Sequence, residues 1–154
     1  MMQVFQSLKN FLDEHKISYE YKEHEEVHTS EEAAKARGED IKIGAKAMIL
    51  KCDGKFIMFV LSAAKKIDSK KLKRLLDCES LRFATAEEVL KLTGCLPGGV
   101  PPFANLFGLD LIVDKSVIDN EHMAFNAGER TKSFKILTHN YVQLLSPRVE
   151  QFSA

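Results

Sequence analysis

Three glycines and three prolines gather in the twelve residues 92–103, although the whole chain has only eight glycines and four prolines. Glycine lets a ligand approach the backbone and proline fixes φ, so this segment predicts a rigid loop with exposed main-chain N–H groups. Such groups can stabilise an oxyanion. We predict that the backbone N–H groups of Gly98 and Gly99 take part in the chemistry and that Pro102 keeps the loop rigid. The alternative is a tight connection with no chemical role.

A second candidate is Lys46, which stands inside the apolar run 45–50. Such a run predicts a strand that is covered on both faces. A lysine in a buried strand is costly unless its ammonium group meets an anion or reaches solvent along its own stem. The strand pattern alone leaves both interpretations open.

His24 and His28 have the spacing of the HExxH zinc motif. Zinc chemistry requires both imidazoles on one face of a helix. Residues 29–32 form a capping-box pattern, which predicts that the helix begins only after His28. We therefore reject a zinc site and predict no metal and no cofactor. Cys95 adjoins the loop, and we expect a small core residue there rather than a nucleophile.

Six basic residues stand among the ten residues 65–74. Asp68 is a suitable N-cap, and Leu72, Leu75 and Leu76 predict the buried stripe of a helix, so the cations would face solvent. A solvated helix face is the interpretation that we favour. Contacts to phosphate groups are the alternative.

The composition is that of an ordinary soluble globular protein of 154 residues, which predicts one domain over residues 1–154. Basic and acidic residues both number 22, so the net charge is zero and extensive gripping of nucleic acid is not indicated. Three widely spaced cysteines favour reduced thiols. No secretory signal or membrane span is evident, and we expect a cytoplasmic protein.

Apolar spacing predicts a helix over residues 4–12, a strand with one buried face over residues 17–21 and a helix from residue 30 to about Gly38. Two strands follow, over residues 45–50 and 56–61, joined by a hairpin turn at Asp53-Gly54. Further elements are predicted in the second half of the chain: a short strand over 81–84, a capped helix from Thr85 to Gly94, strands over 109–113, 121–126 and 133–137, and a last helix from Thr138 that buries Tyr141, Val142, Leu144 and Leu145. This order predicts a mixed α+β fold.

Four segments in this order resemble the YbaK/prolyl-tRNA-synthetase-associated editing family, whose members are small aminoacyl-tRNA deacylases. They are the opening helix at 28–34, the lysine strand at 44–48, the Gly98-x-x-x-Pro102 loop and the strand end at 125–128. The resemblance spans about residues 17–146. It implies a mixed, curled sheet flanked by helices, with a pocket between the loop and the sheet.

The resemblance also implies an activity: a free-standing enzyme that hydrolyses mischarged aminoacyl-tRNA, on tRNA(Pro) or a related tRNA. In that family the 2′-hydroxyl of the terminal adenosine is thought to assist the attack, without a metal. Lys46 would bind the phosphate of that nucleotide, and the segment from Gly98 to Pro102, Gly99 included, would position the ester. Asn126 would contact the aminoacyl group.

Two residues depart from the family pattern. Ala104 replaces a glycine after the Pro-Phe of the loop, and Asn126 stands where the alanine-specific branch has a histidine, which argues against an alanine preference. The expected partner is the acceptor end of aminoacyl-tRNA, with an aminoacyl-tRNA synthetase as an open second partner and no membrane. The competing hypothesis is a catalytically idle module that binds tRNA ends or docks on a synthetase.

Overall fold

The computed structural model describes residues 3–154. The α-helices are α1 (Val4–Glu14), α2 (Ser30–Arg37), α3 (Ser69–Leu75), α4 (Ala86–Thr93), α5 (Lys115–Ile118) and α6 (Thr138–Leu145), and the short 3-10 helices are η1 (Ile41–Ile43) and η2 (Ala104–Leu106). The strands are β1 (Glu20–Glu23), β2 (Ala45–Cys52), β3 (Lys55–Ser62), β4 (Leu81–Phe83), β5 (Asp110–Asp114), β6 (His122–Asn126), β7 (Lys132–Leu137) and β8 (Arg148–Glu150).

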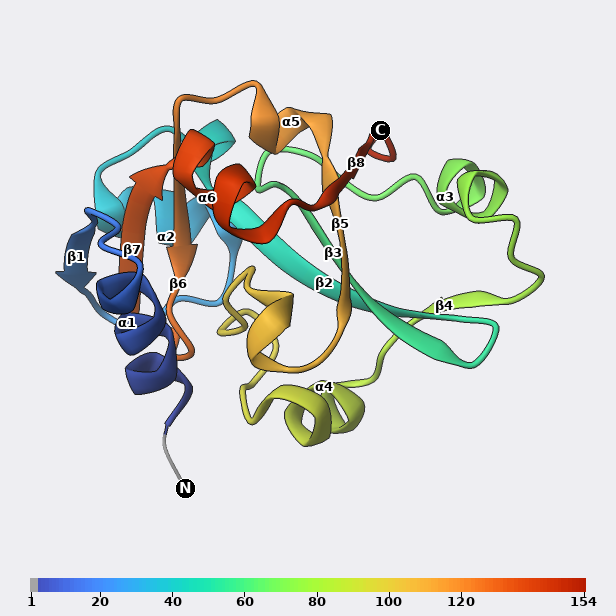
Figure 1. Ribbon diagram of the computed structural model, residues 1–154, viewed down its shortest axis with the longest axis horizontal. Coiled ribbons are helices and arrows are strands. Elements are labelled where there is room, and N and C mark those ends of the chain that lie inside the picture. The colour runs from blue at the N-terminus through green and yellow to red at the C-terminus, as the bar shows by residue number, and fades with distance from the viewer. Residues whose placement is uncertain (1–2) are drawn as a thin grey trace.

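The strands form two sheets, as Figure 1 shows. The smaller sheet has the order β1-β7-β6 and is antiparallel. The larger has the order β4-β2-β3-β5-β8, antiparallel on the β4 side of β3 and parallel on the β8 side. A single parallel bridge between Gly44 and Ala124 joins the two sheets. The predicted mixed α+β architecture is confirmed.

The smaller sheet lies between α1 and α2 (Figure 1). Because successive side chains of a strand point to opposite faces, neighbouring residues of one strand contact different helices. On β7, Phe134 stacks on Phe5 of α1 with the ring centroids 5.6 Å apart. Its neighbour Ser133 faces the other way and accepts a hydrogen bond from Arg37 of α2 at 3.0 Å. One face of this sheet is therefore core, and the other is a polar surface covered by α2.

The larger sheet is apolar on both faces, as its uninterrupted runs predict. Ile49, Met58 and Val60 belong to the main core, which α1 and α6 complete. Leu50 and Phe59 belong to a second core on the opposite face, closed by α3 and the C-terminal segment. The Asp53-Gly54 hairpin is confirmed, with positive φ at both residues, as a type I′ turn requires.

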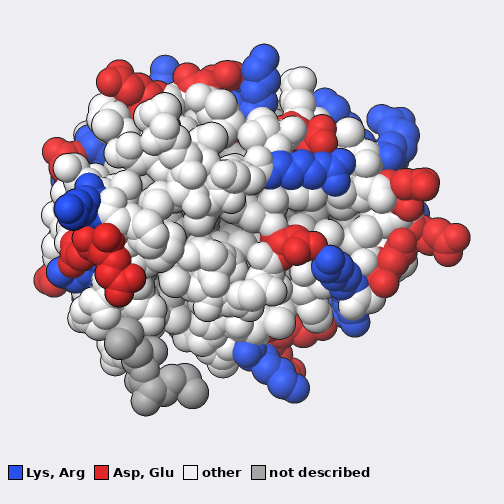
Figure 2. Space-filling view, in the orientation of Figure 1, with Lys and Arg blue, Asp and Glu red and all other residues white. Residues whose placement is uncertain are grey.

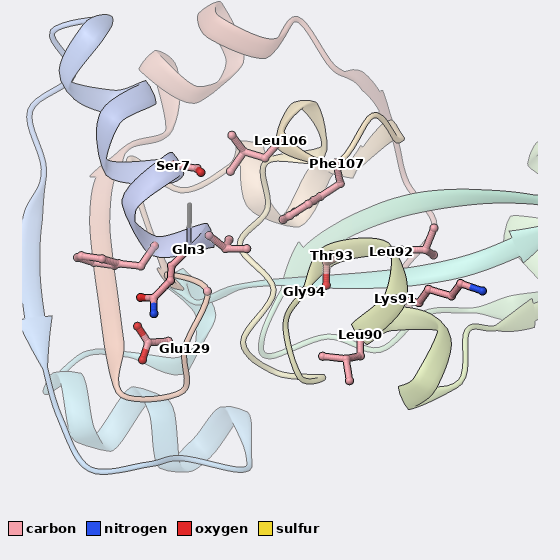
Figure 3. Close-up of a pocket in the computed structure, with 13 residues that line it drawn as sticks. Gln3, Ser7, Leu90, Lys91, Leu92, Thr93, Gly94, Leu106, Phe107 and Glu129 are labelled. Atoms are coloured by element: carbon pink, nitrogen blue, oxygen red, sulfur yellow. The ribbon is translucent and has the colours of Figure 1, made fainter. Parts of the chain in front are cut away.

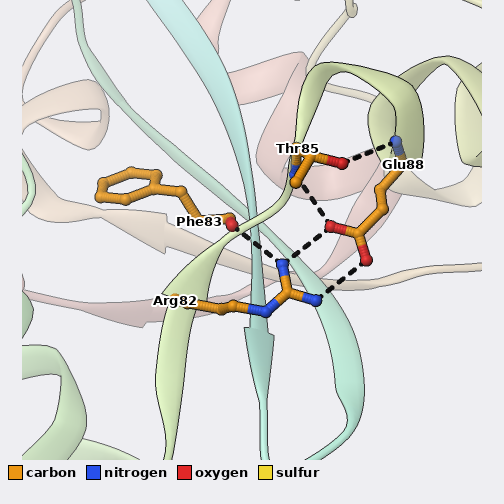
Figure 4. A network of polar contacts seen from close by, with 4 residues as sticks. All are labelled: Arg82, Phe83, Thr85 and Glu88. Carbon is orange, nitrogen blue, oxygen red and sulfur yellow. Dashed lines mark hydrogen bonds and ion pairs between the residues drawn. The ribbon is translucent and has the colours of Figure 1, made fainter.

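Helix caps explain where the helices begin. Thr29 accepts a hydrogen bond from the Glu32 N–H, and Asp68 accepts one from the Lys71 N–H. The capping box predicted at 29–32 is half formed, because the Glu32 side chain does not bond back to Thr29 N–H. Within residues 3–154 the full box forms in α4 alone, where Thr85 and Glu88 exchange bonds (Figure 4). Arg82 donates two hydrogen bonds to the same Glu88 carboxylate, from Nη1 at 2.8 Å and from Nη2 at 3.0 Å. These contacts, the Arg82 bond first, lower the pKa of Glu88 to about 2.

Three predicted details are wrong. The strand predicted over residues 17–21 begins at Glu20 instead, and all four residues of β1 are exposed, although the Tyr21 ring packs against Phe5 of α1 at 5.5 Å. Leu75 ends α3 and is 36% exposed, so it does not belong to the buried stripe. In α6 only Tyr141 of the four predicted apolar residues is fully buried. Within residues 3–154, no helix has both the length and the apolar character needed to cross a lipid bilayer.

Candidate active site

A cavity of about 170 Å³ lies between α2, the start of β2 and the glycine–proline loop, which we define as residues 94–103. Lys46, Gly98 and Asn126, predicted from three distant segments, all line it. The rest of the wall is mostly small and apolar, with Val27, Ala33, Gly44, Ala45, Ala47, Met48, Ala63 and Val100, and its polar members are His28, Thr29, Ser30 and Arg37. Its volume is well below the roughly 300–1,000 Å³ of pockets for drug-sized ligands, so the cavity suits a small group.

Gly99 and Pro102 do not line this cavity. Both are buried behind it. The Pro102 carbonyl accepts a hydrogen bond from the hydroxyl of Tyr141 at 2.5 Å, deep in the core. This contact agrees with the predicted bracing role of Pro102, since it ties the loop to α6.

The loop is attached to the protein through three successive carbonyl groups. The bonds run from Arg130 Nε and Nη2 to Pro97 O (3.0 and 2.6 Å), from Asn126 Nδ2 to Gly98 O (2.5 Å) and from Gly128 N to Gly99 O (2.8 Å). All the donors come from the end of β6 and the turn that follows it. The loop is therefore fixed by its oxygen atoms.

Fixing a carbonyl also fixes the next N–H, because a trans peptide unit is planar and its N–H points away from its C=O. Pro97 O thus sets the direction of the Gly98 N–H, and Gly99 O that of the Val100 N–H. Neither of these N–H groups donates a hydrogen bond within residues 3–154, and both residues line the cavity. The Gly99 N–H donates to Leu96 O at 2.9 Å. Gly99 therefore supports the loop from within and does not offer a free donor.

Asn126 ends β6 with its amide already engaged. Its Oδ1 accepts hydrogen bonds from Arg37 Nη2 at 3.0 Å and from the Ser133 hydroxyl at 3.3 Å, while its Nδ2 holds Gly98 O. Since Asn126 lines the cavity, it can touch a ligand, but most of its bonding capacity serves the loop. The predicted contact with an aminoacyl group remains a prediction.

Arg37 is a residue that sequence reasoning missed. Its side chain is 7% exposed, lines the cavity and joins none of the ion pairs among residues 3–154. Burial lowers the pKa of Arg37, and the charge of Glu39 opposes this effect. A sequence signal existed: Arg37 lies four residues after Ala33, on the buried face of α2.

Lys46 is half-buried at the start of β2, on the same face as Met48. Burial is the main cause that lowers the pKa of Lys46; the nearby Lys66 lowers it further, whereas Glu31 raises it. Like Arg37, Lys46 forms no ion pair among the residues that the structure describes. The cavity thus contains two cationic side chains without a fixed counter-ion.

The other sequence candidates lie outside this arrangement or in its wall. His24 and His28 precede α2, as expected, and the His24 ring contacts Ser133 Oγ at 2.7 Å, whereas His28 lines the cavity. No cluster of metal-ligating side chains occurs within residues 3–154. Cys95 is 2% exposed, and burial raises the pKa of its thiol, as expected for a core residue.

A larger hollow of about 860 Å³ lies on another side, between α1, α4 and η2 (Figure 3). None of the predicted site residues lines it. Its wall includes Leu90, Leu106 and Phe107, with Glu129 and Lys91 as its charged side chains. Figure 2 shows the face that carries α1 and α4: its centre has few charges, and cations and anions alternate around the edge. This hollow lacks the converging donors of the smaller cavity.

Residues 24–144 match the family model described as the aminoacyl-tRNA editing domain. The multifunctional Ser/Thr-tRNA deacylase ProXp-y of Escherichia coli (strain K12) is 31% identical over 134 residues, which cover 84% of this chain and 80% of that protein. The proline–tRNA ligase of Bacillus licheniformis is 35% identical over 103 residues, covering 64% of this chain and 18% of the ligase.

Solved structures show the same fold. A candidate trans-editing enzyme for prolyl-tRNA synthetase superposes with a TM-score of 0.85 at 22% identity, over 100% of this chain and 99% of the other. The hypothetical protein APE2540 gives a TM-score of 0.86 at 22% identity, over 96% and 99%. The family match, which takes in α2, β2, the loop and β6, establishes that this chain belongs to the aminoacyl-tRNA editing domain family.

Proposed function

We propose that this chain hydrolyses the ester bond of mischarged aminoacyl-tRNA and that the 170 Å³ cavity receives the aminoacyl group. The observation that carries the proposal is the convergence of Lys46, Gly98 and Asn126 on one small cavity in a chain of the editing family. An aminoacyl ester is already activated, so its hydrolysis needs a positioned water and a stabilised oxyanion more than a strong nucleophile.

The oxyanion donors that we propose are the N–H groups of Gly98 and Val100. Both belong to residues that line the cavity, both are free of hydrogen bonds within residues 3–154, and the adjoining carbonyls hold both in place. Fixed donors of this kind need no reorganisation when charge develops, and each is worth on the order of 10²–10³ in rate. This assignment replaces the N–H of Gly99, which is bound to Leu96 O.

Lys46 would bind the phosphate of the terminal nucleotide. Its ammonium group has given up part of its hydration without gaining a carboxylate partner, so a phosphate can replace what burial removed. The 2′-hydroxyl of the terminal ribose would then assist the attack, which makes the reaction substrate-assisted and independent of metal ions.

The substrate class that we propose is tRNA charged with a small amino acid. The cavity volume favours a small side chain, and the Escherichia coli relative is named for serine and threonine. Relatives that are proline–tRNA ligases make tRNA(Pro) the first tRNA to test.

The basic segment 65–74 would bind the acceptor stem. Its residues Lys65, Lys66, Lys70, Lys73 and Arg74 are exposed and form no ion pair within the described chain. The segment begins close to the cavity, since Lys66 influences the pKa of Lys46. An RNA strand that leaves the cavity on this side would meet cations that lack a protein partner.

A deacylation panel tests the proposal. Purified protein is mixed with tRNA(Pro) mischarged with alanine, cysteine, serine or threonine and with tRNA(Ala) mischarged with cysteine, serine or threonine, with and without EDTA. We expect hydrolysis of at least one small aminoacyl-tRNA, unchanged by EDTA. Binding of every aminoacyl-tRNA without hydrolysis would favour the idle module instead, and loss of activity with EDTA that zinc restores would refute metal independence.

A further inference from the structure

Arg130 and Arg37 have no assigned role in the proposed reaction, yet both are committed to the loop. Arg130 is mostly buried, with 23% of its side chain exposed, and it directs Nε and Nη2 at one oxygen, Pro97 O. Its remaining nitrogen, Nη1, forms only a long, largely exposed contact with Glu26, at 3.4 Å. The strong contacts of this guanidinium are therefore those to the loop.

Arg37 reaches the loop through Asn126. All the nitrogens of a guanidinium are donors, so the amide atom that faces Arg37 Nη2 has to be the oxygen Oδ1. The same constraint turns Nδ2 towards Gly98 O, 2.5 Å away. Without Arg37, an amide flip would place an acceptor against the Gly98 carbonyl, and the bond would be lost.

We propose that Arg130 and Arg37 are positioning residues that hold the carbonyl groups of Pro97 and Gly98, on either side of the free Gly98 N–H, and thereby aim that N–H into the cavity; the Val100 N–H is set by Gly99 O, which the Gly128 N–H holds. Arg130 acts directly on the peptide unit that ends in the Gly98 N–H. Arg37 acts through Asn126 on the next unit, whose own N–H is bound to Leu96 O, so that unit is fixed at both ends. The expected effect on kcat rests on the proposed function, whereas the expected effect on the position of the loop N–H groups does not.

Kinetics separates positioning from substrate binding. Arg130→Lys and Arg37→Lys keep the positive charge but lose the paired N–H donors of the guanidinium group. We expect kcat to fall about 10²-fold while KM changes little, because the loop N–H groups act on charge that develops in the transition state. Two matched controls remove the neighbouring contacts only. Glu26→Gln removes the ion pair of Arg130, and Lys22→Met removes the bond that Lys22 donates to the Arg37 carbonyl. Both controls should leave kcat unchanged.

A double-mutant cycle tests the route from Arg37 through Asn126. If Arg37 acts through this amide, Arg37→Met should cost no further activity once Asn126→Ala is present. Additive losses would overturn the route. Equal losses of kcat in Lys22→Met and Arg37→Lys would also overturn it, since a general loosening of α2 would then explain both.

An NMR readout keeps the inference testable when a variant, or the wild type, is inactive. The backbone amide resonance of Gly98 should shift or broaden in Arg130→Lys and in Arg37→Met, and stay in place in Glu26→Gln and Lys22→Met. Unmoved loop amides in the arginine variants would refute the positioning role whether or not the protein is a deacylase. If the wild-type protein hydrolyses nothing but the loop amides still move in the arginine variants, the proposed function is refuted and the positioning role stands.

Discussion

Gly98 offers the sharpest test of the loop, because the chain contains a matched control. Its φ is +89°, a conformation that L residues rarely adopt, and Gly54 in the hairpin has φ of +90°. A Cβ at Gly98 would lie 3.6 Å from Arg130 Nε, an ordinary contact, and one at Gly54 would meet nothing within 4 Å. Replacement by alanine therefore introduces backbone strain at both positions and a steric clash at neither.

The expected magnitudes follow from this symmetry. Positive φ costs an alanine about 1–2 kcal/mol, so Gly98→Ala and Gly54→Ala should each lower the free energy of unfolding by that amount. For a chain of this size the loss corresponds to a decrease in Tm of roughly 2–8 °C. Activity should differ, because the loop relieves strain by rotating about Gly98, which turns its N–H out of the cavity. We expect kcat to fall about 10²-fold in Gly98→Ala and to stay near the wild-type value in Gly54→Ala.

The assay is single-turnover deacylation of the best substrate, with thermal melts of the same preparations. Measurements well below both Tm values ensure that the folded protein is compared. Two results would refute the reasoning. Near-normal turnover of Gly98→Ala would make the loop a mere connector, and equal losses of turnover in both variants would show that stability, not the loop, limits activity.

Three further predictions concern charged residues. Lys46→Met should raise KM for aminoacyl-tRNA at least tenfold, because it removes the proposed contact with the phosphate. It should not lower stability in denaturant melts, because it replaces a partly buried ammonium group whose pKa burial lowers. Lys70→Glu combined with Lys73→Glu should reduce kcat/KM for full-length tRNA and flatten its salt dependence, but leave a short aminoacylated oligonucleotide unaffected. Burial acts to raise the pKa of Asp114, yet hydrogen bonds from Ser116, Phe152 and Ser153 outweigh it and lower this pKa. The stabilisation is therefore complete above the unfolded pKa of about 3.9 and is lost as the pH falls through the lower folded pKa. Asp114→Asn should cost about 1–3 kcal/mol at pH 7 and flatten the acid limb of the stability profile.

Local chemistry explains which parts of the fold were predictable. The N-caps at Thr29, Asp68 and Thr85 satisfy backbone groups within three residues, so the sequence alone contains the whole interaction. Gly38 and Gly94 adopt the left-handed conformation that ends a helix, again a property of one residue in its own turn. These capped boundaries were therefore predicted accurately, whereas the short helix α5 (Lys115–Ile118) was not predicted.

Contacts between distant segments were not predictable in this way. The edge strand β8 pairs with β5 only because the C-terminal segment returns to the sheet, and three residues carry no signal of that return. Arg37 meets Asn126 across 89 positions, and Arg130 meets Pro97 across 33. The spacing of Arg37 from Ala33 indicates a buried helix face but does not name its distant partner, and Arg130 carries no such signal. The glycines, Lys46 and Asn126 were therefore found, and the two arginines that fix the loop were missed.

The arrangement of the loop also explains why composition gave no indication of an anionic substrate. A chain with zero net charge can still create a positive site by turning its backbone. Here the carbonyls of residues 97–99 are bound by the protein, while the N–H groups of Gly98 and Val100, which line the cavity, donate no hydrogen bond within residues 3–154. Lys46 and Arg37 add two cations that form no ion pair within residues 3–154, and the low dielectric of a small, mostly apolar cavity strengthens all of these fields. Positive groups thus gather at the place where the ester would react and in the exposed segment 65–74 that begins near it, while the chain as a whole has no net charge. This arrangement favours the end of an RNA over its length, which is what an enzyme needs if it inspects the aminoacyl group and not the tRNA body.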